Sequence, residues 1–376
     1  MKNPFCLKPL PEGAAFCNRE KEITELTRHA INCVNVVISA PRRYGKTSLV
    51  RRVQAILKRK AVNTVYIDFF GASNIEDISS RMAAGIYASI YKKESLFKKA
   101  FKFFSHLRPV IKPDPEAGIS ITMEVAKNVA GIDLLEETMK GLSEFLKKST
   151  RSFNIALDEF QEITELKESG QIEGILRSYI QHQKNVSYFF VGSRRRILLD
   201  IFNNRKRPFY KSAINMTLMQ LPRNKVVEYL TDVFGKNGKD CPQYLAGEIY
   251  DITEGNPYYI QKLSYYVFEK ATHRINKKTL NYALRQMLYE ETPLFEAMLQ
   301  NLRPGQMSFL YSLAKESTKT PFKTDYLLRH HLGSMGGVQA AIKKLVSLDY
   351  IEKTAQGWKV VDPIFALWLR NRKKME

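Results

Sequence analysis

The feature that most constrains this chain is a loop signature placed between a strand-like run and a helix-like run. Residues 39–50 read SAPRRYGKTSLV. The run Cys33–Ser39 before this loop is apolar and of strand length, and apolar residues recur at helical spacing from Thr47 to Leu57. Strand, loop and helix in this order, with Gly-Lys-Thr at the end of the loop, is the context of a phosphate-binding loop.

Three residues of this loop have the chemistry that phosphate binding needs. Gly45 lets the backbone come close to a phosphate, Lys46 supplies a positive charge for the β and γ oxygens, and Thr47 supplies a hydroxyl that can ligate Mg2+. Ala40 stands where the motif usually has its first glycine, and an ordinary basic turn is the alternative reading. The residues expected to bind ATP or ADP are Ala40, Pro41, Arg42, Arg43, Tyr44, Gly45, Lys46, Thr47 and Ser48.

A second acidic motif follows downstream. The apolar run from Phe153 ends in Asp158 and Glu159, which is the Walker B pattern. Asp158 is expected to hold Mg2+ together with Thr47, and Glu159 is expected to orient and deprotonate the attacking water in an in-line phosphoryl transfer. An Asp-Glu pair after an apolar run is common, so alone it is weak evidence. It becomes strong evidence because it follows the phosphate-binding loop in the expected order.

The run Val186–Gly192 reads as another strand and places Ser193 at the same sheet edge. In ATPases with an extra strand between the loop strand and the Walker B strand, a polar residue here senses the γ-phosphate. Ser193 is the candidate, and a plain turn serine is the alternative. With further strands expected at Asn63–Phe70 and Ala213–Leu218, strands alternate with helical segments. This pattern predicts an α/β domain over residues 1–215, with a parallel sheet covered on both faces.

The rest of the chain has a helical rhythm. Apolar residues at helical spacing predict an all-helical lid over residues 216–298. Residues 299–376 read as three helices and a two-stranded wing that turns at Gln356-Gly357, which predicts a winged helix-turn-helix. Its third helix is expected to expose Gln339, Lys343 and Lys344, residue types that contact bases and phosphates. Winged helices also dock proteins, so DNA contact stays one of two readings.

Charge favours an acidic partner. The net charge is +21 and the pI is about 9.6, and such a field attracts polyanions such as nucleic acid. The positive charge is spread through many short clusters, so only their sum is informative. No segment has the length of a membrane span or the pattern of a leader, and a cytoplasmic protein is expected. The four scattered cysteines predict neither a disulfide framework nor a metal site.

Taken together, several motifs resemble one known family. The segments Phe16–Glu22, APRRYGKTSL, ALDEFQEI, FFVGSRR and TEGNPYY are similar to archaeal-type ATPases of the STAND branch of the AAA+ superfamily, relatives of the origin-recognition and Cdc6-type ATPases. The resemblance implies that Ala40 is tolerated in the loop. It also implies that Asn18 and Arg19 lie in a box lining the adenine pocket, and that Pro257, in the GxP motif of the lid, packs on the nucleotide.

The sequence departs from hexameric AAA+ machines in two respects. No clear lid arginine follows Gly255–Pro257, and no single residue identifies itself as an arginine finger. A finger is therefore expected only from a group, and the oligomeric state stays open. The group consists of Arg194, Arg195, Arg196, Arg205 and Arg207.

Two classes of function remain. The first is an ATP-binding, Mg-dependent ATP-hydrolysing switch that couples its nucleotide state to double-stranded DNA through the winged helix. The second is a STAND-type signalling ATPase that acts on a protein partner without touching DNA. Phosphate contacts make binding depend steeply on salt, so a salt titration with duplex DNA separates the two classes.

Overall fold

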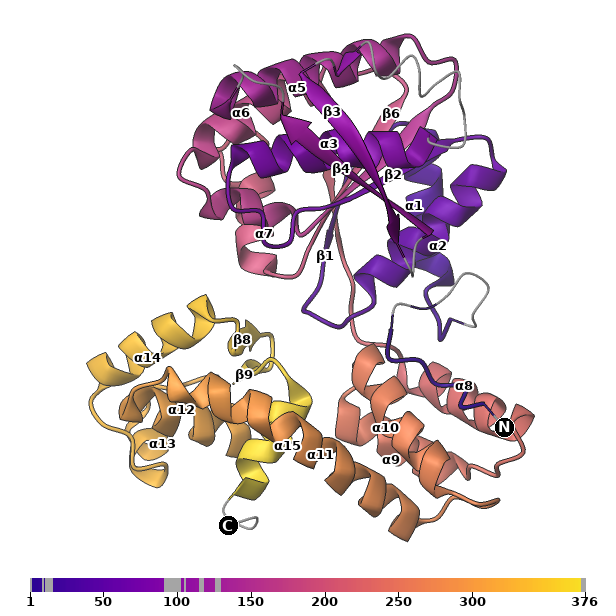
Figure 1. Cartoon of the computed structure of the whole chain (residues 1–376). Helices are drawn as coiled ribbons and strands as arrows, with labels where there is room; N and C mark the ends of the chain where they lie inside the picture. The colour runs from indigo at the N-terminus through magenta and orange to yellow at the C-terminus, as the bar shows by residue number, and fades with distance from the viewer. Residues whose placement is uncertain are drawn as a thin grey trace. The chain divides into compact units, whose positions relative to one another are not determined.

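The chain folds into two compact units, shown in Figure 1. The structure is a computed structural model. It describes residues 2–8, 10, 16–90, 103–104, 106–114, 118–125 and 130–372. Most of the first two hundred residues, from Arg19 to Met219, form the nucleotide unit. The helical unit contains Gln220–Glu376 together with Met1–Leu10 and Ala15–Asn18.

A five-stranded sheet is the centre of the nucleotide unit. Its order is β2-β5-β6-β1-β7, and every neighbouring pair is parallel. The strands are β1 (Val36–Ser39), β2 (Asn63–Asp68), β5 (Phe153–Asp158), β6 (Val186–Gly192) and β7 (Ile214–Thr217). Strand β6 therefore lies between the loop strand β1 and the Walker B strand β5, which confirms the parallel α/β fold with an inserted strand. The carboxyl ends of all five strands meet at one edge of the sheet.

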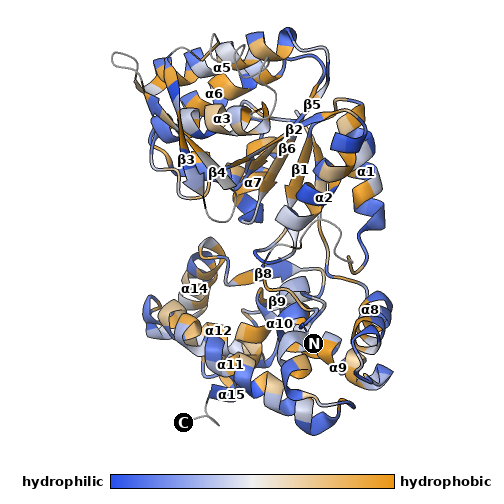
Figure 2. Ribbon diagram, turned by 45° about the vertical axis from the view of Figure 1, so that its right-hand side comes forward, coloured by the Kyte–Doolittle hydropathy of each residue, from blue (hydrophilic) through white to orange (hydrophobic). Residues whose placement is uncertain are grey.

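Helices cover both faces of the sheet because neighbouring strand residues point to opposite sides. Val36 and Ile38 pack with α1 (Glu20–Ile31) and α2 (Lys46–Arg59), whereas Val37 packs with the helices on the other face. The second group comprises α3 (Ile75–Ile90), α5 (Gly131–Lys147), α6 (Ser169–Ile180) and α7 (Arg195–Asn203). Figure 2 shows the apolar strands between helices with hydrophilic outer sides. A sheet buried on both faces explains why its strands read as continuous apolar runs.

Two smaller elements are also found among the described residues of the nucleotide unit. Strands β3 (Leu107–Asp114) and β4 (Gly118–Val125) pair antiparallel in a separate two-stranded sheet, with Ile111 opposite Ile121. A 3-10 helix, η1 (Phe160–Glu165), follows the Walker B strand directly.

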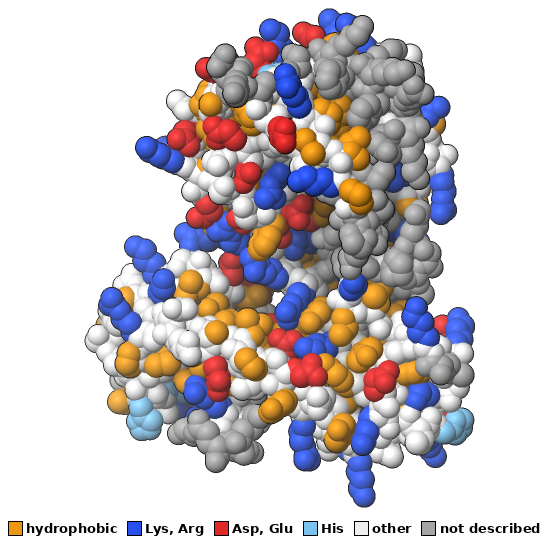
Figure 3. All heavy atoms as spheres, viewed as in Figure 1, with side chains coloured by type: hydrophobic (Ala, Val, Ile, Leu, Met, Phe, Trp, Pro, Cys, Tyr) orange, Lys and Arg blue, Asp and Glu red, His pale blue; other side chains and the backbone are white. Residues whose placement is uncertain are grey.

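Charged side chains lie on the surface of both units, as Figure 3 shows for one face. Net charge alone therefore does not select a binding surface. Within the described residues, no helix is both long enough and apolar enough to cross a membrane.

Four helices begin the helical unit. They are α8 (Arg223–Lys236), α9 (Gln243–Thr253), α10 (Pro257–Lys270) and α11 (Lys277–Gln300). The winged helix follows as α12 (Pro304–Lys315), α13 (Thr324–Arg329), α14 (Met335–Ser347), β8 (Ile351–Thr354), β9 (Gly357–Val360) and α15 (Pro363–Asn371). Strands β8 and β9 pair antiparallel. The helical lid and the winged helix of the predicted fold class are thus confirmed.

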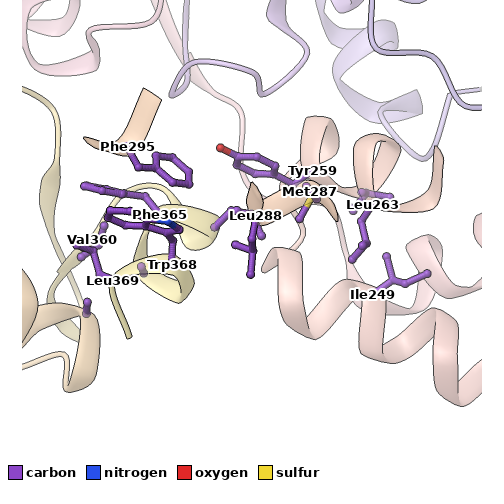
Figure 4. Close-up of a cluster of buried hydrophobic side chains, with 14 of the residues drawn as sticks. Ile249, Tyr259, Leu263, Met287, Leu288, Phe295, Val360, Phe365, Trp368 and Leu369 are labelled. Carbon is purple, nitrogen blue, oxygen red and sulfur yellow. The ribbon is translucent and has the colours of Figure 1, made fainter. Parts of the chain in front are cut away.

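One hydrophobic core runs through the whole helical unit. Tyr259 and Leu263 of α10 belong to the same buried cluster as Phe295 of α11 and Phe365 and Trp368 of α15. Figure 4 shows these side chains together with Met287 and Leu288 between the two ends of the cluster. Helix α11 also continues through position 298, where the lid was expected to end. The lid and the winged helix therefore pack as one unit.

The first residues of the chain belong to the helical unit, although the sequence analysis places them in residues 1–215. Phe5 is buried, with its ring 4.8 Å from that of Phe234 and 6.3 Å from that of Phe268. Asn3 Nδ2 donates to the carbonyl of Tyr265 over 3.2 Å. This placement depends on contacts more than two hundred residues apart, which sequence periodicity does not contain.

Candidate nucleotide site

The phosphate-binding loop joins β1 to α2. Strand β1 is buried along its whole length, and α2 begins at Lys46, directly after Gly45. Gly45 has φ 79°, in the left-handed region that favours glycine. The first backbone NH groups of a helix lack partners within the helix, so the N-terminus of α2 is an anion-binding position at the edge where the strands end.

The side chain of Ala40 is part of the core. Its side chain is fully buried and belongs to the cluster that contains Val191 and Leu218. Its φ is not positive, unlike those of Arg43 and Gly45 in the same loop. Neither conformation nor space at this position demands glycine, which explains how the loop is built with alanine there.

Lys46 points back into the loop. Its Nζ donates to the carbonyls of Ala40 over 3.0 Å and Pro41 over 3.1 Å, and the residue is only 6% exposed. Burial lowers the pKa of Lys46, and the nearby carboxylates of Glu159 and Asp158 act in the opposite direction. The Lys46 cation therefore lies inside the loop, where a phosphate would bind.

Thr47 and Asp158 meet as the sequence predicts. Thr47 Oγ1 donates to Asp158 Oδ2 over 3.1 Å, and Asp158 Oδ1 accepts from the backbone NH of Glu159 over 2.9 Å. Asp158 is 5% exposed. A hydroxyl and a carboxylate oxygen side by side are the hard oxygen ligands that Mg2+ prefers, so the pair fits the metal expected there.

Tyr66 is a site residue that the sequence analysis missed. It lies on β2, the neighbour of the Walker B strand, and its hydroxyl donates to the same Oδ2 of Asp158. Burial and the Asp158 charge raise the pKa of Tyr66 well above its usual range. The guanidinium of Arg51 lies 5.0 Å from the centre of the Tyr66 ring. Tyr66 was missed because its role depends on β2 lying beside β5.

Glu159 is held by two residues of the same sheet edge. Its Oε2 accepts from Ser193 Oγ over 2.8 Å, from the backbone NH of Ser193 over 3.2 Å, and from Gln161 Nε2. Gln161 is fully buried and was also missed by the sequence analysis. A Cβ at Gly192 would lie 1.9 Å from Gln161 Oε1, so glycine is needed for Gln161 to fit. Ser193 is therefore a partner of Glu159 rather than a plain turn residue.

A third carboxylate lies nearby. Asp68 ends β2 and is paired in register with Asp158. Burial raises the pKa of Asp68, the Asp158 and Glu159 charges raise it further, and a hydrogen bond from the Phe70 backbone NH over 2.8 Å opposes the shift. Arg81 holds this turn by donating to the carbonyls of Asp68 and Phe70 over 2.8 and 2.9 Å.

Among the five arginines proposed as a finger group, Arg194 and Arg207 form ion pairs within the nucleotide unit. Arg194 bonds Glu162 over 2.8 Å and Glu165 over 2.6 Å. Arg207 bonds Glu173 and also Asp200, the latter over 2.9 Å. These contacts tie η1, α6 and α7 together. The other members of the group are Arg195, which is half-buried, and Arg196 and Arg205, which are exposed.

The residues expected from the adenine box divide between the two units. Arg19 lies in the nucleotide unit, is 5% exposed, and donates to Glu22 over 2.7 Å and to the carbonyl of Met219 over 2.6 Å. Asn18 and Pro257 belong to the helical unit. Asn256 caps α10 by accepting from the backbone NH of Tyr258 over 3.0 Å, and Pro257 is the first residue of that helix. Contact of Asn18 and Pro257 with a nucleotide stays a prediction.

The residues expected to contact DNA share one helix face. Gln339, Lys343 and Lys344 are exposed on α14, whereas Val338 and Leu345 of the same helix are buried. The helix starts with Ser334, whose Oγ accepts from the Gly337 backbone NH over 3.2 Å. The exposed face of α14 therefore carries two cations and an amide.

A parallel sheet, a phosphate-binding loop between β1 and α2, and an Asp-Glu pair at the end of β5 define a P-loop ATPase domain, here followed by a winged helix. The comparisons with known proteins name the family. Residues 16–263 match the model of an ATPase domain found predominantly in Archaea, and the chain belongs to that family. Residues 293–371 match a probable winged helix domain. The curated proteins contain no match.

Solved structures share the fold over nearly the whole chain. The Walker-type ATPase PABY2304 of Pyrococcus abyssi is 18% identical, with a TM-score of 0.71, and the match covers 98% of this chain and 99% of that one. The Aeropyrum pernix ORC2 protein, in ADPNP-ADP complexes, is 14% identical with a TM-score of 0.59 and 98% coverage of both chains. The Aeropyrum pernix ORC1 protein, in complex with DNA, is 12% identical with a TM-score of 0.51, covering 98% of this chain and 94% of that one.

Proposed function

We propose that this chain binds ATP with Mg2+ and hydrolyses it at the carboxyl edge of the sheet. The observation that carries the proposal is the hydrogen-bonded group formed by Thr47, Asp158, Glu159 and Ser193 beside Lys46. The loop NH groups and Lys46 neutralise the phosphates, and Thr47 and Asp158 hold the metal. Bound Mg2+ supplies charge neutralisation for the phosphate oxygens.

Glu159 is the general base in this proposal. Its Oε2 is occupied by Ser193 and Gln161, and within the described residues no donor is found for Oε1. The occupied oxygen fixes the carboxylate, and the other oxygen is left to accept a hydrogen bond and then a proton from a water that attacks the γ-phosphate in line. Ser193 and Gln161 therefore act as positioning residues for this base.

The proposal is tested by comparing two variants. Glu159→Gln keeps the shape of the side chain but removes its ability to take a proton, so Mg-ATP binds with wild-type affinity and hydrolysis stops. Lys46→Ala removes the positive charge that neutralises the phosphates, so ATP affinity itself is lost. Calorimetry measures binding, and phosphate release measures turnover. Wild-type turnover by Glu159→Gln would show that another group activates the water.

The nucleotide state is proposed to control duplex DNA binding by the winged helix. In the helical unit, the turn around Pro257 is fastened to the winged helix on both sides. Glu254 accepts from Lys359 Nζ of β9 over 3.3 Å, and Tyr259 OH donates to Asp362 over 2.6 Å. If Pro257 packs on the nucleotide, as the family resemblance implies, a movement of this turn also moves the winged helix. Such rigid-body coupling is a common form of switching.

A STAND-type switch that acts on a protein is the second candidate. Two exposed apolar side chains favour this candidate. Leu328 of α13 is 68% exposed and Met335 of α14 is 61% exposed. In addition, α14 has no arginine, although arginine makes the commonest base-specific contact. ATP-dependent affinity for a protein, combined with no salt-dependent affinity for duplex DNA, would favour this candidate.

A further inference from the structure

The chain connections at the edge of the sheet opposite the nucleotide site contain cationic side chains and no carboxylates. Each of the five parallel strands is entered from a helix at this edge. The five connections, with adjoining helix ends, are residues 28–35, 58–62, 147–152, 181–185 and 204–213. They contain twelve Lys and Arg residues and no Asp or Glu. This density of cations is more than twice that of the whole chain.

Almost all of these cations are available to a partner. Arg207 is engaged by Glu173 and Asp200. The remaining eleven are exposed, and none of them forms an ion pair within the described residues. Every strand contributes at least one, for example Lys60 before β2, Arg151 before β5 and Lys184 before β6. We call these eleven residues the amino-edge surface.

Helix dipoles explain only part of this pattern. Cations in the last turn of a helix are stabilised by its partial negative charge. This accounts for four of the eleven residues: Arg28 at the end of α1, Lys58 and Arg59 at the end of α2, and Lys147 at the end of α5. The effect falls off beyond the last turn. Arg151, Lys184 and Lys211 lie after their helices have ended. The carboxyl edge of the same sheet, where the nucleotide site lies, differs because it carries carboxylates as well as cations.

The dimensions of the amino-edge surface suit a phosphate backbone. Neighbouring strands lie about 4.8 Å apart, so five strands spread their connections over about 19 Å. Along the helix axis, one strand of B-DNA advances about 3.4 Å per phosphate, so a row of about 19 Å has the length of between five and six base-pair steps of a duplex. We propose that the amino-edge surface binds the phosphate backbone of duplex DNA. The proposal concerns the nucleotide unit alone and goes beyond the proposed contact of the winged helix.

The aromatic side chains at this edge support phosphate contacts rather than base readout. Lys148 Nζ lies 4.8 Å from the ring centre of Phe103, and Lys211 Nζ lies 5.5 Å from that of Tyr210. These rings orient two of the cations. Contacts to phosphates position a protein on the duplex but carry no sequence information, so the surface is expected to bind random sequences equally.

The test measures binding of the full-length protein to a random duplex of about 30 base pairs at several salt concentrations, with fluorescence anisotropy as the readout. The variant Arg151→Glu/Lys184→Glu reverses two charges in the middle of the row. The control Lys140→Glu/Lys167→Glu makes the same change in net charge at two exposed positions outside it. Each lost phosphate contact lowers the slope of log affinity against log salt by about 0.9. The slope measured for the variant should therefore be smaller than that of the wild type by about two units. At ~0.15 M salt this corresponds to roughly 30-fold weaker binding, whereas the control stays close to the wild type.

Several outcomes are decisive. A variant that loses no more affinity than the control overturns the proposal. So does a variant that loses affinity for anionic lipid vesicles while its duplex affinity is unchanged. If Arg151→Glu/Lys184→Glu does not fold, judged by ATP binding and circular dichroism, the neutralising pair Lys58→Gln/Lys60→Gln replaces it and should lose about two units as well.

Failure of the winged-helix contact is distinguishable from failure of this surface. Lys343→Glu/Lys344→Glu changes only α14. Wild-type duplex affinity in that variant, together with a loss in Arg151→Glu/Lys184→Glu, supports the amino-edge surface and removes α14 from the interface. The reverse pattern overturns the proposal made here and leaves the winged helix as the DNA contact.

Discussion

Ser193 and Glu159 are joined by two hydrogen bonds that end on one carboxylate oxygen. Ser193 Oγ donates to Glu159 Oε2 over 2.8 Å, and the Ser193 backbone NH donates to the same atom over 3.2 Å. Strand β6 thereby fixes the side chain that follows strand β5, its neighbour in the sheet. The inserted strand thus has a direct consequence for the chemistry, because the residue at its end positions the proposed base.

Ser193→Ala should slow hydrolysis without weakening ATP binding. The hydroxyl contact to Glu159 is lost, whereas the backbone contact and Lys46 remain. Because a base displaced by a fraction of an ångström is less effective, we expect turnover to fall by roughly 10- to 100-fold. Steady-state phosphate release measures turnover, and calorimetry measures ATP affinity. Ser193→Thr, which keeps a hydroxyl, is the control and should retain more activity. Equal turnover in Ser193→Ala and the wild type would rule out this role for Ser193.

Tyr66→Phe should destabilise the nucleotide unit. The Tyr66 hydroxyl donates to the buried, charged Asp158. A hydrogen bond to a charged group is worth about 1.5–3 kcal/mol, and we expect the free energy of unfolding to fall by that amount in the absence of nucleotide. The matched control is Tyr188→Phe, which removes a buried hydroxyl that donates to neutral Gln183 and should cost about 0.5–1.5 kcal/mol. Urea titration measures both. A smaller loss in Tyr66→Phe than in Tyr188→Phe would contradict the assignment.

Phe5→Ala should release the N-terminal segment from the helical unit. Phe5 is 3% exposed and packs on Phe234 and Phe268. Truncating a buried phenylalanine lowers the free energy of unfolding by about 3–5 kcal/mol. We expect a loss of about 3 kcal/mol here, because the terminal segment can detach while the rest of the helical unit stays folded. Limited proteolysis near residues 2–8 and thermal unfolding of the helical unit report the change. Phe70→Ala, at a position 58% exposed, is the control and should change stability by less than about 0.5 kcal/mol.

Linear motifs predicted the parts of the site that depend on where strands end and helices begin. Lys46 and Thr47 follow Gly45 and begin α2, Asp158 ends β5, and Ser193 directly follows β6. Because these strands are parallel, the convergence of the four residues follows from the α/β topology. Tyr66 and Gln161 could not be predicted in this way. Their contacts depend on which strands are neighbours and on the rotamers of buried side chains, neither of which periodicity determines.

The fold was predictable to a similar depth. The period of the apolar residues gave the sheet, the helical lid and the wing, because each element buries one face. The shared core of lid and winged helix was not predictable, since residues such as Tyr259 and Trp368 lie in one cluster through contacts about a hundred residues apart. The docking of Phe5 on α8 and α10 was missed for the same reason.

Lys343→Glu/Lys344→Glu tests whether the winged helix touches DNA. Both lysines are exposed on α14, so the folded state should survive the change. If the helix lies in a major groove, two phosphate contacts become repulsive and the salt slope for a random duplex should flatten by about two units, with roughly 30-fold weaker binding at ~0.15 M salt.

ATP affinity should stay at the wild-type value in this variant, because Lys46 and Asp158 belong to the nucleotide unit. The matched control is Lys315→Glu/Lys319→Glu, which reverses two exposed charges of the same winged helix away from α14. Equal duplex affinity and slope in the α14 variant and this control would take the helix out of the DNA interface. The exposed Leu328 and Met335 would then favour a protein as the partner of the winged helix.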